Sequence, residues 1–219
     1  MIQADAERLL KRVFRLFLGT GFLLLAVYEI NYLLGNPFET VRILFDINSG
    51  ANIAAWFSSM QLFSIGIVFL CLRMVMGNCP GNRLFVALGI GFIYLSMDET
   101  AVLHEKIEGV LKQVPWIPRF QEGRGIWITV YGLIGVWLLI VFKTSMVVVS
   151  RKLPRSAMIF ISGAGVFLLG GVVLEVSNYY HLFDSFYEMG SLFEEAAKLV
   201  GGSIMLLGAG NAFLEYYYD

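Results

Sequence analysis

Residues 126–149 of the chain read IWITVYGLIGVWLLIVFKTSMVVV, with Lys143 as the one charged side chain. The hydrocarbon core of a bilayer is about 30 Å thick, and an α-helix needs about 20 predominantly apolar residues to cross it. This run is long enough to do so. A strand of a membrane β-barrel would instead alternate apolar and polar residues over about ten positions. The run therefore predicts a membrane-spanning helix.

Five other segments have the same character. Together with the first they predict six spanning helices, over Val13–Leu34, Asn52–Met76, Leu84–Leu103, Ile126–Val149, Ser156–Tyr179 and Met189–Phe213. The composition agrees, because 58% of the residues are hydrophobic and 15% are charged, against about 25% charged in an average soluble domain. The mean hydropathy is +0.71. We predict an all-α, polytopic membrane protein with a single domain over residues 1–219, partnered by the lipid bilayer and not by nucleic acid.

The distribution of Lys and Arg predicts the orientation. On one side of the six predicted helices lie Arg8, Lys11, Arg12, Arg15, Arg73, Arg83, Lys143, Arg151, Lys152 and Arg155. On the other side lie Arg42, Lys106, Lys112, Arg119 and Arg124. Positive charge is enriched in cytoplasmic loops. Both termini are therefore predicted to be cytoplasmic, with loops 35–51, 104–125 and 180–188 outside, in a bacterial inner membrane.

Ionisable side chains inside the predicted helices are the candidates for function, because each is costly in hydrocarbon and usually faces the bundle interior. Counted from the nearest basic residue at the inner side, Glu29 and Asp98 both lie roughly 21–23 Å along their helices. Glu175 lies slightly further out, and Glu194 is near the start of the last helix. Four helices thus place carboxylates in the outer half of the membrane, and the inner half is predicted to have almost none.

The candidate site consists of acids and both histidines of the chain. Its members are Asp98, Glu99, His104, Glu175, His181, Glu194 and Glu195, with Lys198 as an ion-pair partner and Glu29 as an additional acid. The six-residue spacing from Asp98 to His104 recurs from Glu175 to His181, which suggests a hairpin repeat. Six residues fall about 120° short of two helical turns. Asp98 and His104 can therefore share a face only if the helix unwinds near its outer end, and the ligands of any metal must come from several helices.

A metal site is the leading hypothesis, because carboxylates and imidazoles on facing helices build metal centres in bundles. The Glu-x-x-His pattern of di-iron proteins is absent, and two histidines exclude a three-histidine zinc site. Two histidines with a carboxylate could still hold a divalent metal, iron or zinc, with an open position. Such a metal would activate water or oxygen. The protein would then be metal-binding, or a metal-dependent enzyme for a lipid-like or small apolar substrate.

Two alternatives stay open. The acids could be satisfied by Lys198, Asn178, Gln61 and tyrosines in an accessory or structural subunit of a larger membrane complex or homo-oligomer. The cluster could instead handle protons or cations, because closely packed carboxylates share protons. Against conduction, the predicted polar residues do not continue to the inner side.

The run YLSMDETAVLHE, from Tyr94 to Glu105, resembles a helix of uncharacterised bacterial multi-pass membrane proteins with the pattern L-S-x-D-E-x-x-x-x-H-E. The resemblance covers about a dozen residues. It implies that Asp98, Glu99, His104 and Glu105 belong to one site, and it brings no activity with it. Membrane hydrolases related to alkaline ceramidase look like seven-helix proteins with three zinc histidines, so this chain is set apart from them.

Overall fold

The computed structural model describes residues 2–47, 52–77, 81–118, 120, 125–180 and 187–218. Across these ranges it has six helical stretches long and apolar enough to cross a membrane, which confirms the predicted all-α, multi-pass architecture. They are α1 (Ile2–Leu33), α3 (Ile53–Val75), α4 (Asn82–Ala101), α6 (Ile126–Lys152), the stretch from α7 (Pro154–Leu168) through the π-helix η2 (Leu169–Leu174) to α8 (Glu175–Tyr179), and α9 (Tyr187–Tyr218).

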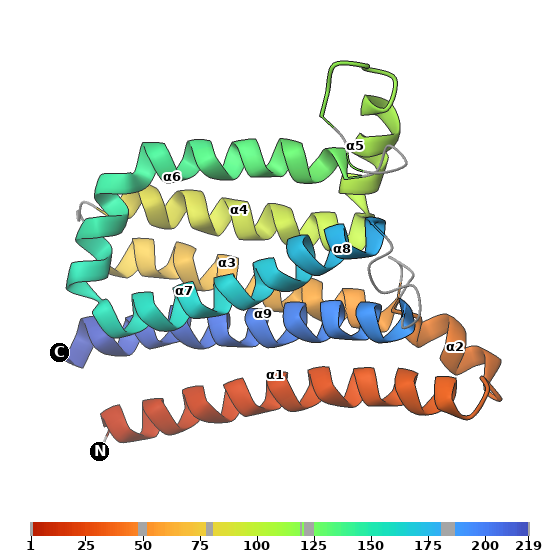
Figure 1. Cartoon of the computed structure of the whole chain (residues 1–219). Coiled ribbons are helices and arrows are strands. Elements are labelled where there is room, and N and C mark those ends of the chain that lie inside the picture. Colours follow the sequence, from red (N-terminus) through yellow and green to blue (C-terminus); the bar gives the residue numbers. More distant parts are fainter. Residues whose placement is uncertain are drawn as a thin grey trace.

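The long helices run side by side and alternate in direction, so both chain ends lie at one end of the bundle, which we call the termini end (Figure 1). Two short helices, α2 (Glu39–Phe45) and α5 (Leu103–Leu111), lie at the opposite end, which we call the α5 end. Helix α5 runs across the bundle axis and extends away from the bundle (Figure 1). The acids predicted for the outer half of the membrane lie toward the α5 end.

Helix α9 packs against α1, α3 and α7, and α3 pairs with α4. The α7–α9 contact is close because glycines line it. A Cβ added at Gly163 would stand 2.6 Å from the backbone nitrogen of Met205, so no larger side chain fits between these two backbones. Glycines permit this approach where lipid offers no hydrophobic drive between helices. The main core lies between α3, α4 and α9, and includes Phe69, Phe85 and Met205.

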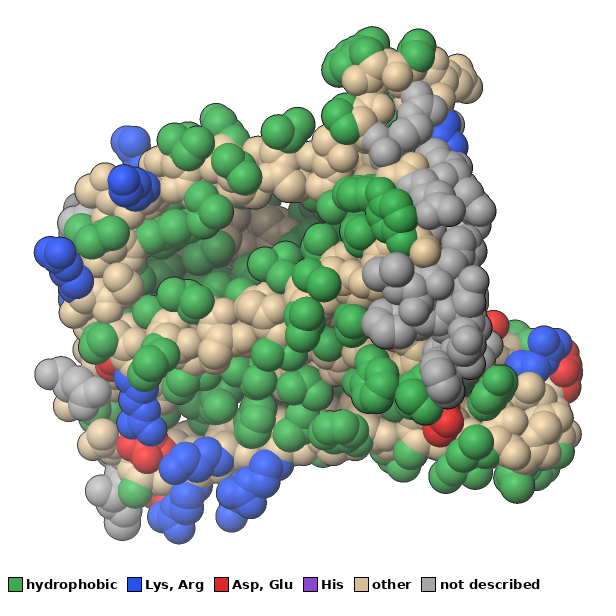
Figure 2. Space-filling view, in the orientation of Figure 1, with side chains coloured by type: hydrophobic (Ala, Val, Ile, Leu, Met, Phe, Trp, Pro, Cys, Tyr) green, Lys and Arg blue, Asp and Glu red, His purple; other side chains and the backbone are tan. Residues whose placement is uncertain are grey.

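Helix α6 packs differently from the other long helices. None of the residues in its most apolar stretch is buried, and a Cβ added at Gly132 or Gly135 would meet nothing within 4 Å. At the termini end Val149 packs against the main core. At the α5 end, aromatic side chains of α6 contact α4 and α5, as described below. Between these two attachments the surface is hollowed, and Figure 2 shows the hollow between α6 and α7.

A buried carboxylate, Glu215, also lies at the termini end, where the sequence predicted almost no carboxylates within the spans. The Glu215 side chain, in a residue 8% exposed, accepts hydrogen bonds from the backbone nitrogens of Arg155 (3.0 Å) and Ser156 (2.8 Å). It also accepts one from the Ser156 hydroxyl, to which Asn211 donates at 3.0 Å. The first N–H groups of a helix lack partners within it and favour negative charge. Glu215 of α9 therefore caps the N-terminus of α7.

Polar side chains also occur midway along the bundle. Gln61 is almost fully buried on α3 and donates to the Ser203 hydroxyl at 2.9 Å and to the Leu199 carbonyl at 3.2 Å. Ser59 contacts Ser96 across the α3–α4 interface at 2.9 Å between hydroxyl oxygens. These bonds tie α3 to α9 and to α4 through buried polar side chains.

Candidate functional site: an acid–histidine cluster at the α5 end

A break in the helix positions the first part of the site. Helix α4 ends at Ala101, and Val102 has φ 53° and ψ 45°, in the left-handed region. A β-branched residue rarely adopts this conformation, because its side chain clashes with the backbone there. Helix α5 then starts at Leu103 in a new direction. This break meets the condition under which Asp98 and His104 can face each other.

Asp98 holds His104 through both carboxylate oxygens. Its Oδ1 accepts a hydrogen bond from the backbone nitrogen of His104 at 2.6 Å. The ring nitrogen Nδ1 of His104 lies 3.2 Å from Oδ1 and 3.1 Å from Oδ2. Asp98 is buried, and the His104 side chain is 23% exposed. The carboxylate therefore orients the imidazole, and Nε2 is the ring nitrogen that Asp98 does not engage.

The charge state of His104 follows from these surroundings. His104 lies in α5, beyond the spanning stretch of α4. Burial disfavours the charged ring, but the hydrogen bond with Asp98 and the negative charges of Asp98, Glu175 and Glu99 outweigh it. The pKa of His104 is therefore raised above its ordinary value of 6.5. The resemblance also implied Glu105 as a site residue, but Glu105 is exposed on α5.

Aromatic residues of α6 close one side of the site. The ring of Trp127 lies 5.1 Å from that of His104, and Tyr131 lies 5.7 Å from Trp127, both measured between centroids. The Tyr131 hydroxyl is 2.9 Å from that of Tyr94 on α4. Sequence reasoning missed Trp127 and Tyr131. Their four-residue spacing at the start of a helix was the available signal.

Lys198 pairs with the two acids of α9 that lie near the α5 end, Glu194 and Glu195. Its Nζ lies 2.5 Å from Oε1 of Glu195 and 3.5 Å from Oε1 of Glu194. The three side chains are 15%, 12% and 14% exposed in that order. Glu99 of α4 acts electrostatically on Lys198, on Glu195 and on His104. Glu99 therefore links the Lys198 group to the Asp98–His104 pair in one charged cluster.

The η2 segment brings α9 close enough to join this cluster. A Cβ at Gly170 would stand 2.6 Å from the Glu194 carbonyl oxygen, and one at Gly171 would lie 3.6 Å from Cδ of Lys198. Directly after η2 comes Glu175, whose charge acts on His104. Single π-turns occur frequently at functional sites of helical proteins. Here the π-helix precedes the acid that α8 contributes.

Two predicted members are not placed in the cluster. Glu29 is half-buried on α1, which lies on the far side of α9 from α4 (Figure 1), and it is not among the charges that act on His104, Glu195 or Lys198. His181 lies outside the described residues, so its place in the predicted repeat does too. In the part of the chain that is described, no group of three or more His, Cys, Asp or Glu residues is arranged to hold a metal ion.

Residues 15–210 match a family model described as a domain of unknown function (DUF8692). The chain belongs to this family. The matched range of the DUF8692 family includes every residue of the cluster and ends before Glu215. Comparison with curated proteins and with solved structures gave no match.

Proposed function

We propose that the chain is a proton-binding membrane protein whose acid–histidine cluster takes up and releases protons at one face of the membrane. The observation that carries this proposal is the imbalance of charge. The cluster gathers the carboxyl groups of Asp98, Glu99, Glu175, Glu194 and Glu195 around two basic groups, Lys198 and His104. Five carboxyl groups placed around two basic groups repel one another, so this excess of negative charge favours uptake of protons or of a cation.

Protons are favoured over a metal ion by the way the acids are already engaged. Both oxygens of Asp98 face His104, and Lys198 draws Glu194 and Glu195 together. Histidine is the side chain that titrates nearest to neutral pH. The hydrogen bond with Asp98 and the nearby acids raise the pKa of His104 above its ordinary value of 6.5, which favours proton binding at this ring.

Exchange at one face fits better than conduction through the bundle. Below the cluster, the buried polar groups continue to Gln61 and Ser203. The next polar residue in contact along α9 is Asn211, about 12 Å further on at 1.5 Å per residue. Buried Leu206 and Ala209 lie within this interval. The proposed function therefore depends on pH at the α5 end. It could be pH sensing or binding linked to proton uptake.

The orientation belongs to the same proposal. Lys and Arg gather at the termini end, where Figure 2 shows most of the blue side chains. By the positive-inside rule this end faces the cytoplasm, and the cluster faces the outside. The membrane would be a plasma membrane, and a bacterial inner membrane is the version that the sequence pattern favours.

A metal is the second candidate, and one observation favours it. A carboxylate that holds one ring nitrogen of a histidine is the usual support behind a metal-ligating imidazole. With Asp98 on Nδ1, the Nε2 atom of His104 could join Glu99, Glu175 and the predicted His181 around iron or zinc. Asp98 would then be a positioning residue and not a ligand.

Proton counting tests the proposal. Purified protein in weakly buffered detergent is taken from pH 8 to pH 6, and proton uptake is measured with a pH-sensitive dye. Wild type is expected to take up more protons than His104→Gln. Glu29→Gln, outside the cluster, is the matched control and should equal wild type.

Metal analysis of the same samples separates the two candidates. Stoichiometric iron or zinc in wild type, lost in Glu99→Ala or Glu175→Ala, would overturn the proton proposal in favour of the metal. Equal proton uptake by wild type and His104→Gln would also overturn it.

A further inference from the structure

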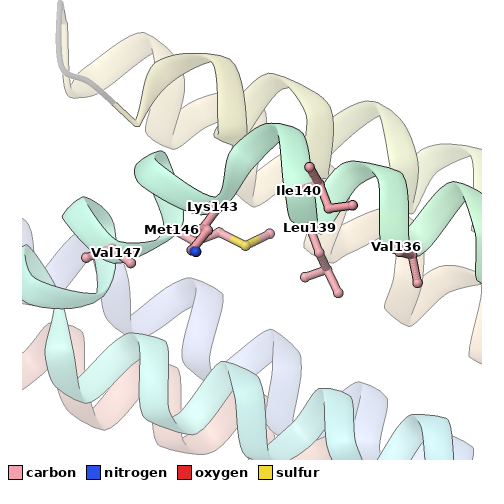
Figure 3. Close-up of a pocket in the computed structure, with 6 residues that line it drawn as sticks. All are labelled: Val136, Leu139, Ile140, Lys143, Met146 and Val147. Carbon is pink, nitrogen blue, oxygen red and sulfur yellow. The ribbon is translucent and has the colours of Figure 1, made fainter.

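The hollow beside α6 is a groove of about 420 Å³. Its lining side chains all come from α6, and they are Val136, Leu139, Ile140, Lys143, Met146 and Val147. Figure 3 shows Leu139, Lys143 and Met146 pointing from α6 into the space that faces α7. The spacing of three, four and seven residues places these side chains on one stripe of the helix. The groove is thus an open, apolar face of α6 that carries one cationic side chain.

The dimensions of this stripe match one leaflet of a bilayer. From Val136 to Val147 the helix rises about 16 Å, which is about half of a 30 Å hydrocarbon core. Most of the stripe lies in the half of α6 nearer the termini end. Lys143 lies about 26 Å from the start of α6, close to where the hydrocarbon ends. A lysine at this level can extend its ammonium group toward lipid headgroups.

We propose that this groove holds one acyl chain of an anionic phospholipid from the leaflet at the termini end, with Lys143 paired to its phosphate. Charge complementarity selects the headgroup, because Arg151 and Lys152 are exposed further along the same helix. Basic side chains near the surface attract anionic lipid. The apolar stripe accepts the chain, which enters sideways from the bilayer. This site is separate from the acid–histidine cluster and does not depend on its function.

A lipid chain fits this groove better than another helix does. The groove is open on the side away from α6, and an acyl chain is thin enough to lie along it. A second helix would bury Lys143 against apolar side chains, which is unfavourable without a paired charge. The headgroup of the lipid brings the required negative charge.

Native mass spectrometry of the full chain in mild detergent tests the proposal, with phosphatidylglycerol and phosphatidylcholine added separately. Wild type is expected to retain one phosphatidylglycerol more strongly than phosphatidylcholine. Lys143→Gln should reduce that preference about fivefold. Leu139→Trp should fill the groove and weaken retention of both lipids, and it should leave the fold intact because Leu139 is exposed. Arg8→Gln removes an exposed charge of the same end and is the control.

Equal retention of the two lipids by wild type would overturn the proposal. So would an unchanged preference in Lys143→Gln or unchanged retention in Leu139→Trp. A dimer in detergent that Leu139→Trp converts to a monomer would show that a second copy occupies the groove. A phosphatidylglycerol preference that falls equally in Arg8→Gln would show general surface attraction instead of a site.

Discussion

Helix α9 carries acids at both of its ends, and the acids at the two ends have different kinds of partner. At the termini end, Glu215 has a complete set of fixed donors, namely two backbone nitrogens of α7 and the Ser156 hydroxyl. At the α5 end, Glu194 and Glu195 share Lys198, and Glu99 adds a further negative charge. A buried carboxylate with fixed neutral donors is a structural group, and a crowded one with too few bases is placed to exchange protons.

Removing Lys198 from the α5 end should have the largest effect on the free energy of unfolding. Lys198→Met leaves Glu194 and Glu195 without their cation, and breaking such a pair is expected to lower the free energy of unfolding by about 4 kcal/mol. The loss should be smaller at pH 5 than at pH 8, because protonated acids no longer repel each other. Unfolding in mixed micelles at both pH values measures it. Lys11→Met, an exposed control, should cost under about 0.5 kcal/mol, and an equal loss in both variants would contradict the pairing.

Removing the acid from the termini end should have a smaller effect. Glu215→Ala leaves the first N–H groups of α7 without their acceptor and should lower the free energy of unfolding by about 3 kcal/mol. Glu215→Gln keeps one acceptor oxygen and should cost about 1 kcal/mol. The same unfolding assay checks both variants. Proton uptake between pH 8 and pH 6 should stay as in wild type for Glu215→Gln, and a loss of uptake there would erase the contrast between the two ends.

The smallest expected effect is the pH dependence due to His104. Its folded pKa is raised above 6.5, so its charged form stabilises the fold below pH 6.5, and this contribution is lost as pH rises through the folded pKa. The difference in melting temperature between wild type and His104→Gln should therefore be more favourable to wild type at pH 6 than at pH 9. A difference that does not change with pH, or that grows toward pH 9, would contradict the Asp98 contact.

The six spans were predictable because hydrocarbon requires about 20 apolar residues in each. The distance along each helix was predictable for the same reason, since every residue adds 1.5 Å. The place of each helix around the bundle axis was not predictable. Glu29 and Asp98 were expected at similar depth, but α1 and α4 lie on different sides of α9. Glu215 was missed because it lies beyond the predicted last span, Met189–Phe213.

The site was predictable in residue type but not in its local geometry. The six-residue spacing showed that Asp98 and His104 would need a break between them, but no sequence rule places that break at Val102, since valine is disfavoured in the left-handed region. Trp127 and Tyr131 were not recognised because aromatic residues near the ends of membrane spans are common. Tertiary contacts decide both features.

The π-helix before Glu175 gives the stretch from α7 to α8 two independent halves. Each residue of an α-helix turns it by about 100°, and a π-turn takes in one residue more than an α-helical turn does. Shortening Leu169–Leu174 by one residue would rotate Glu175 about 100° away from His104. The contact of Gly163 with Met205 would stay unchanged. Insertions or deletions in this segment can therefore redirect the acid without changing the packing of α7 on α9.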